Sequence, residues 1–177
     1  MKSRGPQMKF QDQSIKQMHQ FGGSLLKNSN AKTKRPISTK HAMHVVLRSS
    51  LARGEWSLRS AKNLRMVEKT VRTQAQKYGI KIYEFANVGN HLHLLIKVGN
   101  RHTFAPFMRA ISGIIALKVT GARKAKELKQ KFWDYRPWSR VVQWRKAYSV
   151  VKDYVVQNHL EAIGAVPYQP RRRRAPA

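Results

Sequence analysis

An α+β domain built on an antiparallel sheet is the fold that this sequence predicts, on three observations. Short apolar or β-branched runs alternate with longer segments whose apolar residues recur every three or four positions. A compact turn at 87–90 separates two of the short runs, as in a β-hairpin. The chain has 177 residues, enough for one domain with a substantial core and polar tails.

A basic, polar segment precedes the predicted domain. Residues 1–40 show little apolar periodicity and contain the loop signal Gly22-Gly23. We expect an N-terminal arm there. A solvated tail and an arm that contacts DNA both remain open.

The first half of the domain is predicted to be strand, helix and strand. Residues 43–49 are β-branched and apolar, which is typical of a strand. Helical spacing of apolar residues follows, in a helix that Ser57 or Ser60 can cap and that continues to about Tyr78. Residues 80–85 form the second strand.

The next segment has the clearest strand pattern in the chain, because it alternates with a period of two. Its apolar face consists of Leu92, Leu94, Ile96 and Val98. His91 and His93 share the opposite face, with Leu95 and Lys97, so both imidazoles point the same way and can share one cation.

The second half is predicted to be helix, strand and helix, followed by a tail. Thr103 can cap a helix that Gly121 ends. A strand at 139–144 precedes the last helix at 145–163. Residues 167–177 include four consecutive arginines and are too charged to pack, so we expect a disordered basic tail.

The order strand, helix, strand, strand, helix, strand, helix is that of the split βαβ, or ferredoxin-like, plan. It predicts an antiparallel sheet with helices on one face, the other face free for a site, and an additional C-terminal helix. The predicted organisation is an arm (1–40), a single domain (41–166) and a basic tail (167–177).

The composition favours a polyanionic partner. The chain carries 36 Lys+Arg against 8 Asp+Glu, a formal charge of +28, and nucleic acid is the leading candidate. The absence of cysteine excludes disulfides and cysteine-ligated zinc. The sequence shows no apolar run near the length of a membrane span and no apolar core of a signal peptide, so we expect a cytoplasmic protein without a membrane partner.

The last helix carries a candidate nucleophile and a candidate ligand. Tyr154 and Asn158 are four residues apart and therefore share a face of the helix. Tyr148 is the alternative nucleophile, although it lies about 240° around the helix from Tyr154. His44, on the first strand, is predicted to be a structural or DNA-contacting residue.

These residues resemble a known family. The His-Leu-His segment at 91–93 resembles the histidine–hydrophobic–histidine motif of the HUH endonucleases. The Tyr-Val-Val-Gln-Asn segment at 154–158, with the residues up to 166, is similar to the tyrosine-helix signature of the single-tyrosine HUH transposases, which include the REP-associated tyrosine transposases. Three further segments resemble bacterial members: 35–40, 132–134 and 140–142.

The resemblance implies a DNA transposase that cuts and rejoins single-stranded DNA, at hairpin-forming ends. His91 and His93 would hold a divalent ion, Mg²⁺ or Mn²⁺, which polarises the scissile phosphate. Tyr154 would attack that phosphate, leaving a 5′-phosphotyrosine bond and a free 3′-hydroxyl, and the reverse attack would rejoin the strands.

The resemblance places the third metal ligand on the tyrosine helix, where Asn158 occupies its position. Gln157 is an alternative, because some relatives use glutamine. His159 stands where many relatives have proline and is a second alternative. These departures leave open a degenerate, inactive copy of a transposase.

Arginines and aromatic residues are the predicted DNA contacts. Arg136 and Arg140 lie among aromatic residues that can stack on unpaired bases or pack in the core: Trp133, Tyr135, Trp138 and Trp144. In the tail, binding to phosphates is predicted for Arg171, Arg172, Arg173 and Arg174.

A different class of function remains an alternative. A ferredoxin-like sheet with exposed aromatic residues and strong positive charge also suits a non-catalytic protein that binds single-stranded nucleic acid. The short linker before the last helix favours a monomer over a homodimer that exchanges tyrosine helices. The resemblance to bacterial proteins implies a cytoplasmic protein that meets DNA at the nucleoid.

Overall fold

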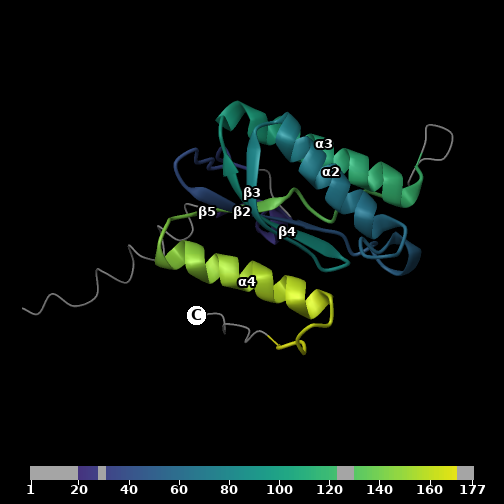
Figure 1. Ribbon diagram of the computed structural model, residues 1–177. Coiled ribbons are helices and arrows are strands. Elements are labelled where there is room, and N and C mark those ends of the chain that lie inside the picture. The colour runs from purple at the N-terminus through teal and green to yellow at the C-terminus, as the bar shows by residue number, and fades with distance from the viewer. Residues whose placement is uncertain (1–19, 28–30, 123–129, 171–177) are drawn as a thin grey trace, which may run out of the picture.

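The computed structural model describes residues 20–27, 31–122 and 130–170, drawn in colour in Figure 1. Its strands are β1 (Gln20–Phe21), β2 (Ala42–Arg48), β3 (Ile80–Asn87), β4 (His91–Val98) and β5 (Trp138–Val142). Its helices are α2 (Asn63–Lys77), α3 (Arg101–Thr120) and α4 (Lys146–Ala162), with short 3-10 turns η1 (Gly23–Leu26) and η2 (Gly54–Trp56).

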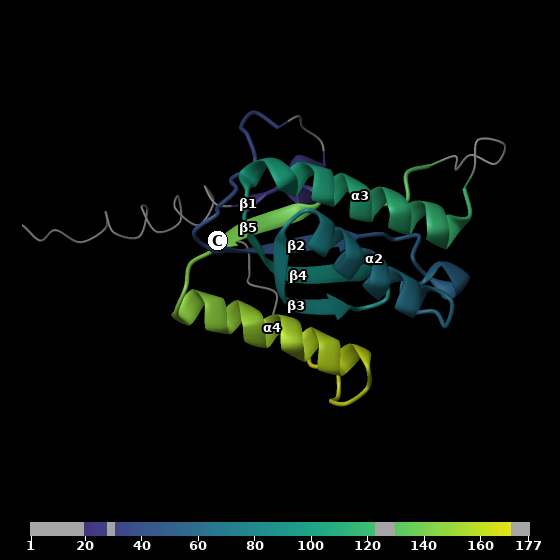
Figure 2. The ribbon, with the colours of Figure 1, turned by 45° about the horizontal axis from the view of Figure 1, so that its top comes forward.

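The strands form one sheet in the order β1-β5-β2-β4-β3, and every neighbouring pair is antiparallel. Helices α2 and α3 lie side by side on one face, and α4 crosses the other (Figures 1 and 2). The predicted α+β, ferredoxin-like fold is therefore confirmed. The second face is less open than predicted, because α4 packs mainly against β3 and β4.

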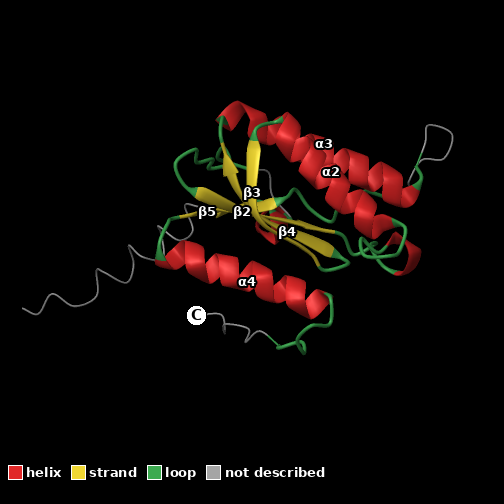
Figure 3. Ribbon diagram, in the orientation of Figure 1, coloured by secondary structure: helices red, strands yellow, loops and turns green. Residues whose placement is uncertain are grey.

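The main hydrophobic core lies between the sheet and the pair α2 and α3, which form the upper helical layer in Figure 3. The alternation of β4 decides which residues enter it. Leu92, Leu94 and Ile96 are completely buried in this core. Leu95 faces the opposite way, into a smaller core under α4 that contains Ala42, Ala86, Leu95, Val142, Val151 and Val155.

The beginning of α2 differs from the prediction. The helix starts at Asn63, and no side chain within the described residues caps its N-terminus. Ser57 and Ser60 instead belong to turns: Ser57 Oγ accepts from the Arg59 backbone N–H, and the Ser60 carbonyl accepts from the Asn63 backbone N–H. A serine that satisfies a local turn leaves the helix to begin one turn later.

The beginning of α3 also differs. Asn100 is the N-cap, and its Oδ1 accepts from the His102 backbone N–H at 2.9 Å. Thr103, the predicted cap, donates its hydroxyl to the Asn100 carbonyl at 2.8 Å. Asparagine is as strong an N-cap as serine or threonine, and its position two residues before His102 lets it bond the N2 amide.

Helix α3 is long and apolar enough to pass a length-and-composition test for a membrane span, contrary to the sequence prediction. Its buried residues explain that composition. They face the main core and are Phe104, Phe107, Met108, Ile111, Ile115 and Val119. The helix packs against α2, as expected of a core helix.

Part of the predicted arm belongs to the sheet. Gln20 and Phe21 pair with Arg140 and Ser139 at the edge of β5. Gly22 has φ 84°, and a Cβ there would collide with the Pro137 carbonyl. This turn therefore needs glycine for its conformation and for its close approach to β5.

Arg35 ties this N-terminal segment to β5. Its Nη1 donates to Ser139 Oγ at 2.5 Å and its Nη2 to the Pro137 carbonyl at 2.7 Å. Its guanidinium also lies 4.4 Å from the centre of the Phe21 ring. Burial, and then Arg136, lower the pKa of Arg35 to about 10. The domain boundaries at 40 and 166 remain predictions.

Candidate active site

A cavity of about 590 Å³ opens on the sheet face that α4 partly covers. Strands β2, β4 and β5 form its floor and α4 one wall, with the N-terminal turn and the loop before β5 completing it. Its lining residues include Ser24, His44, Arg48, His91, His93, Tyr135, Arg136, Trp138, Arg140, Val150 and Tyr154. Residues from six separate segments therefore meet at one place.

His91 and His93 lie side by side on β4, as their spacing requires, with ring centres 4.7 Å apart. His93 is 3% exposed, whereas His91 is half-buried at the start of the strand. Their rings meet at 75°, edge to face. The structure thus brings both predicted ligands to the same cavity.

A hydrogen bond orients each of these two rings through its Nδ1 atom. Asn90 Oδ1 lies 2.5 Å from His91 Nδ1, and His44 Nε2 lies 3.1 Å from His93 Nδ1. Burial, and then Arg48, lower the pKa of His91. A lowered pKa keeps an imidazole neutral, which is the form that can bind a cation.

Tyr154 reaches the cavity from α4 and is 37% exposed. Its ring centre is 5.4 Å from that of His93 and 6.0 Å from that of His44. The helix is held there by Val151 and Val155, which are buried in the smaller core. The apolar packing of Val151 and Val155 against the sheet therefore holds Tyr154, the candidate nucleophile, beside the histidines.

Tyr148, the alternative nucleophile, lies in a different environment. Its ring packs at 5.6 Å from Tyr83 and 4.9 Å from Trp144, measured between ring centres. Burial, and then Tyr83 and Glu84, raise the pKa of Tyr148. This aromatic cluster supports the start of α4, and it makes Tyr148 a poorer source of phenolate than an unperturbed tyrosine.

The three candidate third ligands point to different places. Asn158 is 7% exposed, and its Nδ2 donates to the Tyr154 carbonyl at 2.6 Å. Gln157 donates to Glu161 Oε1 at 2.9 Å. His159 lines a separate hollow beside β3. Of the described residues that line the histidine cavity, none is one of these three.

Three arginines give the cavity its charge. Arg48 comes from β2, Arg136 from the loop before β5, and Arg140 from β5 itself. Burial lowers the pKa of Arg140. The two predicted DNA-binding arginines of the domain are thus together, and Arg48 is an addition that the sequence analysis did not single out. Arg171, Arg172, Arg173 and Arg174 lie outside the described residues.

The four aromatic residues of the sequence analysis separate into two pairs. Tyr135 and Trp138 line the cavity. Trp133 donates its indole N–H to the Ser112 carbonyl at 2.9 Å and packs against the main core. Trp144 donates to the Lys40 carbonyl at 2.8 Å. Only the first pair, among the four, is placed to meet a ligand in the cavity.

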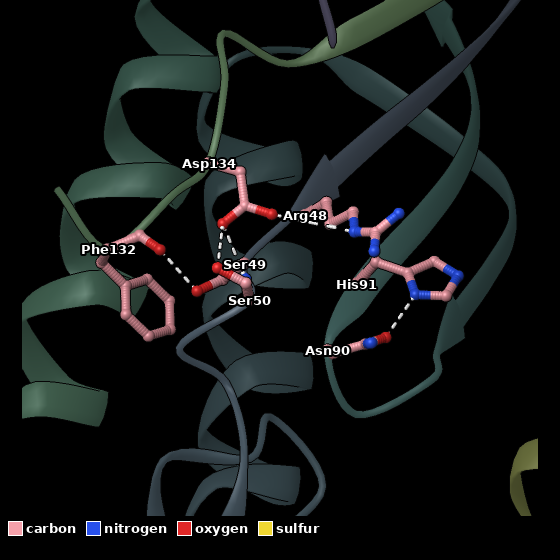
Figure 4. A network of polar contacts seen from close by, with 7 residues as sticks. All are labelled: Arg48, Ser49, Ser50, Asn90, His91, Phe132 and Asp134. Atoms are coloured by element: carbon pink, nitrogen blue, oxygen red, sulfur yellow. Dashed lines mark hydrogen bonds and ion pairs between the residues drawn. The ribbon is translucent and has the colours of Figure 1, made fainter. Parts of the chain in front are cut away.

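A polar network fixes the loop before β5 to the end of β2 (Figure 4). Asp134 Oδ1 accepts from both the backbone N–H and the hydroxyl of Ser50, at 2.7 and 2.8 Å. Asp134 Oδ2 lies 3.7 Å from Arg48 Nε. The Ser49 hydroxyl donates to the Phe132 carbonyl, and its backbone N–H donates to Asn90. The network links the aromatic loop, Arg48 and the turn that orients His91.

His44 is the functional candidate whose position the sequence analysis did not predict. It is 5% exposed on β2 and lies between His93, Trp138 and Tyr154. Burial, and then Arg140, lower the pKa of His44 to about 3. The signal in the sequence is the alternation of β2, which puts His44, Val46 and Arg48 on the face opposite Met43, Val45 and Leu47.

The site thus combines a histidine pair on β4 with a tyrosine on the helix that packs over the sheet. The sequence profile of the family described as "Transposase IS200 like" matches residues 37–158, more than half of the chain. The protein belongs to this family of single-tyrosine HUH transposases. No curated protein matches the chain in sequence.

A solved structure shares the fold. A REP-associated tyrosine transposase bound to a REP hairpin is similar with a TM-score of 0.60 and 15% identity, over 78% of this chain and 81% of that one. A candidate transposase from Deinococcus radiodurans R1 is similar with a TM-score of 0.43 and 17% identity, over 73% and 98% respectively. At 15% identity, the likeness to the first of these concerns the fold alone.

Proposed function

We propose that this transposase cuts and rejoins single-stranded DNA through a 5′-phosphotyrosine intermediate formed on Tyr154. The observation that carries the proposal is the convergence of Tyr154, from α4, with His91 and His93, from β4, on one arginine-lined cavity. A non-catalytic binding protein has no need of a tyrosine and two histidines in that arrangement.

The chemistry is an in-line exchange of phosphoester bonds. Tyr154 Oη attacks the phosphorus and gives up its proton to water, the new O–P bond forms, and the bond from phosphorus to the 3′-oxygen breaks as that oxygen takes up a proton from water. The released strand leaves with a 3′-hydroxyl, whose attack in reverse restores a phosphodiester. Arg48 and Arg140, which line the same cavity, would stabilise the extra negative charge on the phosphoryl oxygens.

The residues present fit a divalent cation as an open site. His91 and His93 would supply two imidazoles, each with Nδ1 engaged by a neighbouring residue, so Nε2 of each would face the ion. Bound there, the ion would polarise the scissile phosphate. Within the described ranges no group of three His, Cys, Asp or Glu could hold a metal, so the remaining ligands would be an amide oxygen, water or the DNA. Asn158 stays our candidate for the amide, and since it does not line the cavity here, its side chain would have to turn toward the histidines.

Two imidazole donors favour Mn²⁺ over Mg²⁺, because nitrogen ligands suit first-row transition ions better than they suit Mg²⁺. Both ions remain candidates for the cofactor in the cell.

Single-stranded DNA with a hairpin is the substrate that we propose. The relative of known structure was solved with a REP hairpin. In this chain, Tyr135 and Trp138 line the cavity beside Arg136 and can stack on unpaired bases. We propose a monomer that acts on DNA in the cytoplasm, because the link between β5 and α4 spans only residues 143–145.

An adduct assay tests the proposal. The protein is incubated with labelled single-stranded hairpin oligonucleotides and Mn²⁺ or Mg²⁺, and DNA-linked protein is detected on a denaturing gel. We expect a metal-dependent band that Tyr154→Phe and a His91→Ala/His93→Ala double variant abolish. Tyr148→Phe is the matched control, because that tyrosine lies on the same helix outside the cavity, and it should keep the band.

Three outcomes would contradict parts of the proposal. Loss of the band in Tyr148→Phe alone would assign the nucleophile to the other tyrosine. A band that persists in EDTA would show that adduct formation does not depend on a divalent ion. Tight, EDTA-insensitive DNA binding without any adduct across a broad hairpin library would favour a binding protein or an inactive copy.

A further inference from the structure

His44 is a buried polar side chain on the floor of the cavity and has no role in the chemistry proposed above. It occupies the central strand β2, between β5 and β4, where its register partners are Arg140 and Leu95. Only 5% of its surface is exposed. Burial of a polar ring costs free energy unless the ring makes hydrogen bonds, so an imidazole at this position needs a hydrogen-bond partner.

His93 is that hydrogen-bond partner. His44 Nε2 and His93 Nδ1 are 3.1 Å apart, and the two rings are within 20° of parallel. One of these nitrogens must carry the proton and the other must accept it. When His93 uses Nε2 for a cation, its proton sits on Nδ1, and His44 Nε2 is then the acceptor.

His91 shows the same arrangement with a different partner. Its Nδ1 lies 2.5 Å from Asn90 Oδ1, at the exposed end of β4. Both candidate ligands thus have Nδ1 engaged by a neighbour. Partners of this kind fix the tautomer and orientation of a ligating histidine.

We infer that His44 is a positioning residue, which sets the tautomer and ring orientation of His93 for cation binding. The inference rests on the proposed metal-dependent function. His44 is not itself a third ligand, because its Nε2 makes a hydrogen bond to His93 Nδ1. The described histidines do not form a group of three that could bind one ion. Its ring also contacts Trp138 and Tyr154, so it joins the cation site to the nucleophile.

Variants of His44 separate a positioning role from simple packing. His44→Leu introduces an apolar side chain of similar size that cannot accept a hydrogen bond. His44→Gln places an amide oxygen where Nε2 lies and should restore most of the function. His102→Leu, at an exposed position on α3, controls for the loss of a histidine.

The first measurement is the binding of Mn²⁺ alone, without DNA, followed by the loss of the free-ion EPR signal. We expect His44→Leu to weaken the affinity roughly 10- to 100-fold, His44→Gln to recover most of that loss, and His102→Leu to match the unchanged protein. Native affinity in a folded His44→Leu would overturn the inference. If the unchanged protein itself does not bind Mn²⁺, the result contradicts the metal dependence of the proposed function rather than the role of His44.

The second measurement needs no variant and no metal. Long-range ¹H–¹⁵N NMR spectra of histidine side chains report which ring nitrogen is protonated. We expect His93 to carry its proton on Nδ1, with the chemical shift of the accepting nitrogen on His44 Nε2. A His93 protonated on Nε2 would overturn the inference whatever the result of the metal titration.

Discussion

Individual residues of one type take different roles here because their surroundings differ. His44, His91 and His93 share one cavity, but His91 is half-buried, whereas His44 and His93 are almost completely buried and hydrogen-bond each other. Tyr154 and Tyr148 lie on one helix, yet only Tyr154 reaches the cavity. The residue type therefore identifies candidate functional residues, and the surrounding residues determine which of them can act in the site.

Arg35 is a residue whose geometry cannot be replaced by charge alone. We expect Arg35→Lys to lower the free energy of unfolding by about 1–3 kcal/mol, because an ammonium cannot keep the paired bonds to Ser139 and Pro137. Urea denaturation followed by circular dichroism measures this. Lys34→Ala, at the exposed neighbouring position, is the control and should change stability by less than about 0.5 kcal/mol. Equal stability of the two variants would show that Arg35 contributes charge only.

At the scale of elements, α4 is the part that makes the sheet into a site. Its packing residues Val151 and Val155 belong to the smaller core, while Tyr154 lies between them on the side of the cavity. Any looseness in this packing moves the tyrosine relative to β4. Displacements on the scale of 1 Å can cost about 100-fold in rate.

Val155→Ala tests this coupling between packing and position. Removing two buried methyl groups should lower the free energy of unfolding by about 1.5–3 kcal/mol. Adduct formation should also fall well below the unchanged protein under conditions in which the variant remains folded. Val150→Ala, on the same helix and 60% exposed, should leave stability within about 0.5 kcal/mol. Unchanged adduct formation in a folded Val155→Ala would argue that α4 positions the tyrosine by other contacts.

The junction between β5 and α4 stores backbone strain. Arg145 has φ 71° and ψ −132°, a conformation that only glycine adopts without cost. We expect Arg145→Gly to raise the free energy of unfolding by about 1 kcal/mol, after allowance for the greater freedom of glycine in the unfolded chain. Arg145→Ala keeps a Cβ and should leave stability within about 0.5 kcal/mol. Thermal melting of the two variants provides the comparison.

At the scale of the whole molecule, the net charge of +28 dominates encounters with nucleic acid. The arginines of the cavity add direction to this general attraction. Phosphate contacts release counterions, so DNA affinity should fall steeply with salt, by about 0.7 in logarithmic slope for each contact with a single strand.

We expect the basic tail to contribute to the salt dependence of DNA affinity. Replacing Arg171–Arg174 with glutamine should reduce the slope by up to about 3, if all four contact phosphates. Adduct formation at low salt should change little, because the cavity residues are intact. Fluorescence anisotropy with a labelled hairpin across a salt series measures the slope. An unchanged slope would identify the tail as solvated and not DNA-bound.

The sequence by itself determined the sheet class, the order of the main elements and the strand that carries the histidines. Alternation and helical spacing are local properties, so β4 and α4 could be assigned from their own residues. The starts of α2 and α3 were wrong, because several nearby polar residues competed to satisfy the first helical N–H groups and only the folded turn selects among them.

Tertiary structure alone decided which residues meet. His44 joins His93 because β2 pairs with β4, and Gln20–Phe21 joins β5 although the residues around it are polar and aperiodic. Arg48 enters the cavity for the same reason, while Trp133 and Trp144 turn away to bond backbone carbonyls. Such contacts depend on pairing between segments far apart in the chain, and no local pattern of residues encodes that register.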